Sequence, residues 1–343
     1  MVSSDAQRTV DFYAGILGLH LVKKTVNFDD PASYHLYFGD ETGNPGTLLT
    51  FFEWKNGEKG HRGIGATHHL ALGVEGIDAQ LKWKRLLVDR GVKVRGPLNR
   101  NYFRSIYFED PDGLILEIAT RGPGWTIDEP TQTLGTEFIV PPEEMQRGKR
   151  DEAAIAATTW PEPVHSITPD MTLKGLHHIT AIASDIERTT AFYTETLGMQ
   201  VLKKTLNYDD LSSPHYYFGV GEGRPGAIIT YFEYSHQTMR EGFVGTGMTH
   251  HFAFAVANDE EQLLWRERLL SSGQHVSPVR DRTYFHSIYF NDPDGHILEI
   301  ATLGPGFAVD EKKDALGQAL SLPLWLEPER DTIEASLTPI RIQ

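Results

Sequence analysis

The chain has 343 residues, of which 40% are hydrophobic, enough for an ordinary buried core. It contains no cysteine, which excludes disulfide bonds and thiolate metal sites, so any metal ion would be held by His, Asp or Glu. The formal net charge of −15 argues against nucleic acid and anionic membranes as partners. The N-terminal segment MVSSDAQRTV lacks the features of a secretory signal, and no apolar run approaches the roughly 20 residues of a membrane span. We therefore expect a cytoplasmic protein.

The sequence consists of two copies of one half. Residues 10–30 match residues 190–210 at an offset of 180, and residues 100–120 recur at 282–302 with only four differences. Such self-similarity is typical of a duplicated architecture. We expect the following organisation: a first half at 1–122 (modules 1 and 2), a linker at 123–174, a second half at 175–304 (modules 3 and 4) and a C-terminal arm at 305–343.

Each half contains two smaller modules with one order of elements. The third module is predicted to begin with the strand LHHITAIA, followed by a helix at 186–197 that Asp185 can cap and that Gly198 can end. The motif DPDG, found twice, predicts a turn between two strands. The fold class is therefore α+β, with four βαβββ modules. The remaining predicted elements are strands at 200–208, 214–220, 226–234 and 249–256, a helix at 259–273, and strands near 275–279, 284–290 and 296–302.

The first module lacks its opening strand. Met1 aligns with Ala181, so nothing in the chain corresponds to GLHHIT at 175–180. We favour an internal methionine of a longer chain over a module that truly lacks the strand, because a lost strand would leave the hydrogen bonds of a sheet edge unpaired. The intact mass of the native protein distinguishes the two.

The candidate chemistry lies on predicted strands that alternate between two faces. His69 shares its face with small residues, and so does His251. Glu117 and Glu299 stand in the middle of apolar strands, where a carboxylate is costly unless it is paired or binds a metal. A single such residue is commonly structural, but the repetition favours a metal site. Three His-His pairs occur at equivalent strand starts: 68–69, 177–178 and 250–251.

These motifs resemble a known family. LVKKTVNFDD, YHLYFG and PGTLLTFF, together with IYFxDPDG and LEIATxGPG, resemble the vicinal oxygen chelate (glyoxalase/bleomycin resistance/dioxygenase) superfamily, and within it the hydroquinone-type ring-cleaving dioxygenases. The resemblance implies modules paired into cupped mixed sheets around a divalent ion, Fe(II), with Mn(II) as the alternative. It also implies an extradiol-type dioxygenase of aromatic compound catabolism, which cleaves a hydroquinone or catechol with O₂.

The resemblance also implies the residues of the site. It assigns the metal ligands His178, His251 and Glu299, with His69 and Glu117 as the duplicate set. If modules 2 and 3 pair, the complete set is His69, Glu117 and His178, whereas pairing of modules 3 and 4 gives the first set, and the sequence leaves both open. The resemblance implies further catalytic residues around the ion for proton movement and charge stabilisation: His177, Thr180, His250, Arg282 and Tyr289, duplicated as His68, Arg100 and Tyr107.

Two other functions remain open from the sequence. A glyoxalase-like lyase or isomerase needs a fourth protein ligand, but Thr50 and Thr230 occupy that position, and Glu53 and Glu233 alternate onto the opposite face. A non-enzymatic protein that binds aromatic drugs is the second alternative. These residues do not determine the substituents of the substrate ring or the position of cleavage. They also do not determine whether the protein forms a homo-oligomer.

Overall fold

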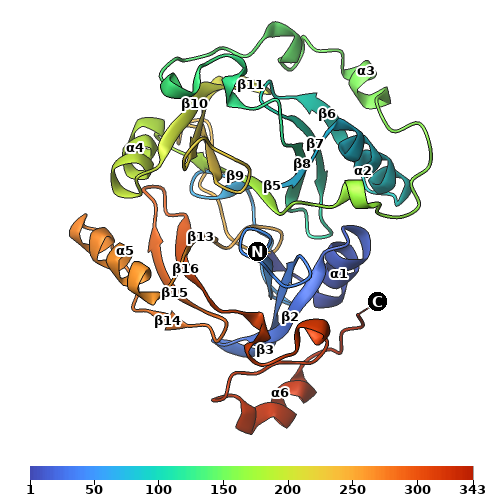
Figure 1. Ribbon diagram of the computed structural model, residues 1–343, viewed down its shortest axis with the longest axis vertical. Helices are drawn as coiled ribbons and strands as arrows, with labels where there is room; N and C mark the ends of the chain where they lie inside the picture. Colours follow the sequence, from blue (N-terminus) through green and yellow to red (C-terminus); the bar gives the residue numbers. More distant parts are fainter. Residues whose placement is uncertain (343) are drawn as a thin grey trace. The chain divides into compact units, whose positions relative to one another are not determined.

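The structure is a computed structural model that describes residues 1–342 (Figure 1). It contains two compact units. Unit 1 combines Met1–His61 with Phe243–Gln343, and unit 2 is Arg62–Gly242. Unit 1 therefore contains modules 1 and 4, and unit 2 contains modules 2 and 3. The α+β class and the duplicated modules are confirmed. The two halves describe the repeat in the sequence, whereas the compact units combine modules from both halves.

Unit 2 is built on one curled eight-stranded sheet with the order β10-β11-β12-β9-β5-β8-β7-β6. The two modules join where β5 and β9 pair in antiparallel fashion, with His69 opposite Thr180 and Ala71 opposite His178. This pairing answers the question that the sequence left open, because it joins module 2 to module 3. The strands are β5 (Thr67–Val74), β6 (Arg95–Asn99), β7 (Arg104–Glu109), β8 (Ile115–Thr120), β9 (Leu176–Ala183), β10 (Gln200–Asn207), β11 (Asp210–Gly219) and β12 (Ile228–Glu233).

The helices of unit 2 lie on the outer face of this sheet (Figure 1). Helix α2 (Ile77–Asp89) packs on β7 and β8, and its buried Gln80 amide donates hydrogen bonds to two strand carbonyls. Helix α4 (Ile186–Ala191) is capped by Asp185, as predicted, and continues as a π-helical turn to Thr196. The connector contains one α-helix, α3 (Glu152–Ala157), and short 3-10 turns η2 (Trp125–Ile127), η3 (Thr131–Thr133), η4 (Glu143–Met145) and η5 (Pro169–Met171).

Unit 1 contains two four-stranded sheets, with the orders β1-β4-β3-β2 and β13-β16-β15-β14. The opening strand of module 1 consists of the two residues of β1 (Val2–Ser3), which pair in parallel with β4, as β9 pairs with β12 in unit 2. The other strands are β2 (His20–Asn27), β3 (Asp30–Gly39), β4 (Leu49–Glu53), β13 (Phe252–Val256), β14 (Arg280–Asp281), β15 (Phe285–Asn291) and β16 (Ile297–Pro305). The helices are α1 (Ala6–Val10) with π-turn η1 (Asp11–Ile16), α5 (Asp259–Ser271), η7 (Phe307–Val309), η8 (Lys313–Ala315), η9 (Glu327–Glu329) and α6 (Arg330–Ser336).

Two predicted strands of module 4 differ from the structure. The strand expected near 275–279 is absent, and the short β14 lies at 280–281 instead, because the Tyr289 N–H donates to the Ser277 hydroxyl rather than to a backbone carbonyl. The strand expected at 249–256 begins only at Phe252. Its counterpart β5 begins earlier because β9 supplies partners for Thr67 and His69.

Each module pair carries a following arm that a buried lysine holds. In unit 2, Lys203 Nζ contacts Asp128 Oδ1 at 2.6 Å and also Glu129. In unit 1, Lys23 Nζ makes the same contacts with the corresponding acidic pair, at 2.6 Å to Asp310. Among residues 1–342, no helix has the length and apolar character to cross a membrane.

Candidate metal centre

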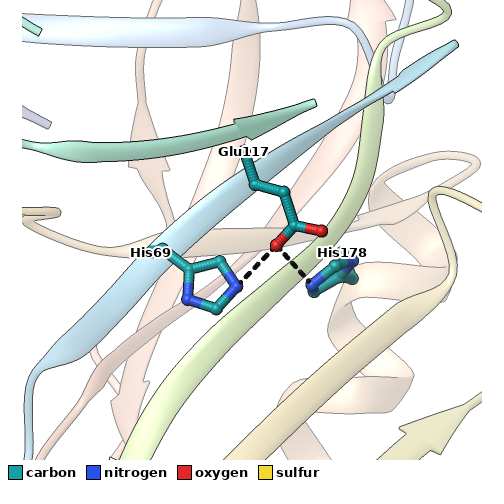
Figure 2. Close-up of side chains that lie close together, drawn as sticks. All are labelled: His69, Glu117 and His178. Carbon is teal, nitrogen blue, oxygen red and sulfur yellow. Dashed lines mark ion pairs between the residues drawn. The ribbon is translucent and has the colours of Figure 1, made fainter. Parts of the chain in front are cut away.

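Three strands of unit 2 bring one potential ligand each to a single point. His69 is on β5, Glu117 on β8 and His178 on β9, and their ligand atoms all lie within 4.8 Å of one another (Figure 2). Register explains the convergence, because Ala71 of the central strand pairs with both Glu117 and His178. His69 lies two residues before Ala71 and therefore shares its face. The small side chain of Ala71 leaves room for the ligands on either side.

The distances and burial of the three side chains fit a metal ion. Glu117 Oε2 lies 2.9 Å from His69 Nε2 and 3.5 Å from His178 Nε2, and all three residues are buried. Within residues 1–342, this buried oxygen has no assigned hydrogen-bond partner other than the two imidazoles that face it. The other oxygen, Oε1, accepts a hydrogen bond of 2.5 Å from Ser105. A buried carboxylate oxygen that faces two imidazole nitrogens is suited to coordination of a metal ion.

The protonation states also suit a metal. Burial alone would raise the pKa of Glu117, but His178 and His69 outweigh it and hold this pKa well below its ordinary value. Burial lowers the pKa of His69, against the opposing effect of Glu117. The carboxylate is therefore ionised and the His69 imidazole neutral near pH 7, which are the forms that bind metal ions.

The preceding histidine of each pair orients the ligand ring. His68 Nδ1 lies 2.8 Å from His69 Nδ1, and His177 Nδ1 lies 2.9 Å from His178 Nδ1. These contacts engage the Nδ1 atoms, so each ligand directs its Nε2 at Glu117. Burial lowers the pKa of His177 to about 3, so its ring is neutral and its Nδ1 can accept a hydrogen bond from Nδ1–H of the ligand histidine. Such outer partners fix the tautomer of metal-binding histidines.

Arg100 and Tyr107, both predicted site residues, lie behind the glutamate. Tyr107 pairs with Glu117 across strands β7 and β8, and its ring stands edge-on to that of His69. Arg100 Nε donates to the Tyr107 hydroxyl at 3.2 Å and Nη2 to Asp209 at 2.9 Å. Burial raises the pKa of Tyr107, which keeps the phenol protonated as a hydrogen-bond donor.

Thr180, also predicted, contacts the Nε2 atom of His69. Its hydroxyl oxygen is 3.0 Å from His69 Nε2 and accepts a hydrogen bond of 2.8 Å from Thr230. Thr230 in turn lies 3.0 Å from His215 Nε2.

Sequence reasoning missed His215, Ser105 and Asp209. The first two had a detectable signal: His215 recurs as His35 in the motifs PHYYFG and YHLYFG, and Ser105 alternates with Tyr107 on one strand face.

The duplicate residues assemble in unit 1 without a third ligand. His251 Nε2 lies 2.9 Å from Glu299 Oε2, and Tyr289 donates a hydrogen bond of 3.0 Å to Glu299 Oε1. Arg282 donates to Tyr289 at 3.2 Å, and His250 contacts His251 through Nδ1 at 2.9 Å. Within residues 1–342, only unit 2 brings three potential metal ligands together.

The two glutamates considered as a fourth ligand lie elsewhere. Glu233 Oε2 accepts a hydrogen bond of 2.7 Å from Ile186 N at the start of α4, and Glu53 Oε1 accepts one of 3.0 Å from Ala6 N at the start of α1. Both are on the helix side of their sheets, as strand alternation predicts. This arrangement disfavours a four-ligand lyase or isomerase.

Comparisons with known proteins identify the family and the relatives of the chain. The model of the Glyoxalase/Bleomycin resistance protein/Dioxygenase superfamily matches residues 1–118 and 175–300. The chain is 34% identical over 340 residues to the "Putative ring-cleaving dioxygenase MhqO" of Bacillus subtilis, covering 98% of this chain and 93% of the relative. It is 29% identical over 338 residues to the chlorohydroquinone/hydroquinone 1,2-dioxygenase of Sphingobium indicum, covering 97% and 92%. A crystal structure titled as a "putative dioxygenase" of Bacillus subtilis superposes with a TM-score of 0.78 at 32% identity, covering 100% of this chain and 96% of that one.

Proposed function

Because the chain belongs to the glyoxalase/bleomycin resistance protein/dioxygenase superfamily, we propose that it is a metal-dependent ring-cleaving dioxygenase of extradiol type. Its substrates would be O₂ and a hydroquinone or catechol. The observation that carries this proposal is the convergence of His69, Glu117 and His178 on one buried point. The names of the relatives supply the class of substrate.

The number and kind of ligands favour Fe(II), with Mn(II) as the alternative. Two imidazoles and one carboxylate form the ligand set typical of non-haem Fe(II) oxygenases, which leaves positions open. Thr230 stands where a four-ligand lyase would need another acid, and a threonine hydroxyl is a weak ligand. When bound, the ion would supply a Lewis acid that lowers the pKa of the diol and a redox centre shared with O₂.

The surrounding side chains would shape and dry the site. The ring of Phe103 lies 4.9 Å from that of His177 and 5.2 Å from that of His178, while Phe232 lies 5.3 Å from His68. Such apolar walls exclude water and strengthen the electrostatic interactions inside. We propose that they also hold the flat aromatic ring of the substrate against the ligand set.

Polar side chains would manage charge and protons. The Arg100 guanidinium, held by Asp209 and Tyr107, places a fixed positive charge where negative charge develops on the diol. The phenol of Tyr107 can donate a hydrogen bond to an oxygen of the substrate. His68 and His177 carry neutral rings whose low pKa values leave them as hydrogen-bond acceptors rather than fixed cations.

Matched substitutions in the two units test the proposal, and the variant in unit 1 serves as the control. Protein loaded anaerobically with Fe(II) is offered hydroquinone and catechol in an oxygen electrode. We expect oxygen uptake that falls at least about 100-fold in Glu117→Ala, because even outer residues of metal sites cost 10–100-fold. The matched Glu299→Ala should retain most activity, since no third ligand joins His251 and Glu299 among residues 1–342.

Other outcomes would contradict the proposal. Full activity in Glu117→Ala would remove unit 2 as the site. Isomerase activity without oxygen uptake would support the lyase alternative, and retention of an aromatic ligand after loss of the metal, without turnover, would support a binding protein.

A further inference from the structure

A line of buried hydrogen bonds runs across four neighbouring strands of unit 2 and ends at a proposed metal ligand. His215 on β11 contacts Thr230 on β12 at 3.0 Å. Thr230 donates to Thr180 on β9 at 2.8 Å, and Thr180 lies 3.0 Å from His69 Nε2 on β5. All four residues are buried, so water does not compete for these bonds.

The line has a defined direction. Burial lowers the pKa of His215 well below its ordinary value, so its ring is neutral and carries one N–H. Because the Thr230 hydroxyl donates to Thr180, its oxygen accepts from His215, which places that N–H on Nε2. Thr180 then keeps its own proton to donate on the side of His69. The His215 ring is held between Tyr217 and Phe232, with ring centroids 4.2 Å and 4.3 Å away.

We propose that His215 and Thr230 are positioning residues that fix the Thr180 hydroxyl as a hydrogen-bond donor to the diol oxygen held beside His69. This inference rests on the proposed function. A donor that is oriented in advance stabilises an ionised oxygen more than a neutral one, because charge-assisted hydrogen bonds are the stronger kind. His215, Thr230 and Thr180 would therefore favour ionisation of the diol without exchanging a proton with it.

The sequence repeat provides matched control positions in unit 1. His35 corresponds to His215 and Thr50 to Thr230. His35 packs on Tyr37 and Phe52 at 4.2 Å and 4.1 Å between ring centroids, almost as His215 packs. However, His35 Nε2 has no hydrogen-bond partner in the described part of the chain, and its Nδ1 contacts the Tyr37 hydroxyl at 3.0 Å instead. The same substitution therefore perturbs similar packing at both places but breaks a line of hydrogen bonds only in unit 2.

The experiment uses the full chain and 4-nitrocatechol, whose absorption changes when it ionises. The ionised fraction of bound 4-nitrocatechol is measured anaerobically at constant pH on Fe(II)-loaded protein, together with metal content and melting temperature. Oxygen uptake then gives kcat and KM for catechol and hydroquinone. The variants are Thr230→Val and His215→Phe, the conservative Thr230→Ser, and the controls Thr50→Val and His35→Phe.

We expect Thr230→Val and His215→Phe to lower the ionised fraction and to reduce kcat roughly 10-fold, the scale of one charge-assisted hydrogen bond, with metal content kept. Thr230→Ser should restore both values, and the two controls should match the unaltered protein. If His215→Phe does not fold, the valine and serine variants at position 230 decide the question alone.

The contrary outcomes separate this inference from the proposed function. If the unaltered protein consumes oxygen and Thr230→Val has the same kcat and the same ionised fraction of 4-nitrocatechol, only the positioning role is overturned. A Thr230→Ser variant as impaired as Thr230→Val would also overturn that role alone. An unaltered, Fe(II)-loaded protein that neither binds 4-nitrocatechol nor consumes oxygen would overturn the proposed function, and the positioning role with it.

Discussion

At the scale of single residues, Asp209 organises the charges behind the candidate site. Its Oδ1 contacts Arg95 Nη2 at 2.9 Å and Arg150 Nη2 at 2.7 Å, while its Oδ2 contacts Arg100 Nη2 at 2.9 Å. One carboxylate thus holds three guanidinium groups, and one of them reaches Tyr107. The orientation of Arg100 toward the site therefore depends on a residue from the other module of unit 2.

We predict that Asp209→Asn destabilises the protein by about 2–3 kcal/mol, because it leaves partly buried guanidinium groups without their charge partner. The matched change Asp29→Asn in unit 1 should cost less than about 0.5 kcal/mol, as expected for an exposed pair. Asp29 is exposed and lies 3.9 Å from Arg282 Nη1. Urea unfolding of both variants measures the difference, and equal losses would contradict this account.

Asp209 should also make stability depend on pH. Burial raises its pKa, but Arg100, Arg95 and Arg150 outweigh burial and lower the pKa below the ordinary value. A lowered carboxyl pKa stabilises the fold above the unfolded pKa of about 3.9, and this contribution is lost as the pH falls toward the folded pKa. Between about pH 4 and pH 2, the urea midpoint of the unaltered protein should fall more steeply than that of Asp209→Asn. Parallel curves would contradict the prediction.

At the scale of elements, strand β5 has to keep a small residue between the ligands. Ala71 is fully buried and pairs with both Glu117 and His178. Its counterpart Ala253 on β13 is exposed. The same alanine therefore has different constraints in the two copies of the strand.

We predict that Ala71→Val lowers metal affinity at least about 10-fold, because the added methyl groups displace the ligand side chains of neighbouring strands; such overpacking costs about 1–3 kcal/mol. Ala253→Val should leave metal affinity unchanged. Metal titration of apoprotein measures both, and an unchanged affinity in Ala71→Val would show that the ligands do not need this space.

The arm that follows module 2 is a second element with a defined attachment. The buried Lys203 ammonium contacts Asp128 and Glu129, and it lies 5.0 Å from the centre of the Tyr102 ring. Glu129 also accepts hydrogen bonds from Glu137 N at 3.1 Å and Gly135 N at 3.4 Å. The lysine thus links strand β10 to the arm between residues 128 and 137.

Replacement of this lysine should release the arm. Lys203→Met leaves two carboxylates without their cation, so we expect faster amide hydrogen exchange in residues 128–137 and a stability loss of about 3 kcal/mol. Lys204→Met, a change at the neighbouring and less buried lysine, is the control and should leave exchange in this segment as it is. Amide hydrogen exchange is measured by mass spectrometry for both variants. Unchanged exchange of residues 128–137 in Lys203→Met would contradict the role of Lys203 in holding the arm.

At the scale of the whole molecule, duplication has produced two units with unequal ligand sets. Unit 2 brings together three potential ligands, and unit 1 brings together His251 and Glu299. Two ligands hold a metal ion less tightly than three in a buried site. The molecule should therefore behave as a protein with one metal site in spite of its internal repeat.

We predict one tightly bound divalent ion per chain in equilibrium dialysis. Glu117→Ala should abolish this binding, and Glu299→Ala should preserve it. Saturating metal should also raise the stability by about 2.7 kcal/mol at a free concentration 100 times the dissociation constant. If the protein binds two equivalent ions and each variant loses one of them, the two units bind metal equally and the prediction is wrong.

Much of the fold could be predicted because its signals are local or repeated. The period of apolar residues, the Asp185 cap and the DPDG turns each act within a few residues, and Gly113 takes the positive φ of 87° that the turn needs. The two glutamates stood out because a buried carboxylate in an apolar strand is costly, and the family resemblance implied the full ligand set. His215 and Asp209 were missed because their partners come from other strands, and although His215 recurs as His35, the repeat alone does not show which strand it contacts.

The sequence by itself determined that four modules of the βαβββ kind occur and that any metal would be bound by His and carboxylate. The family resemblance of its motifs implied the candidates His69, Glu117, His178, His251 and Glu299. Only the tertiary structure decided which of these residues meet. The pairing of β5 with β9 is a contact between segments more than 100 residues apart, set by hydrogen bonds between strand edges that carry no signature in either strand alone. That one pairing places His178 beside Glu117, so that unit 2 has three candidate ligands together and unit 1 has two, His251 and Glu299.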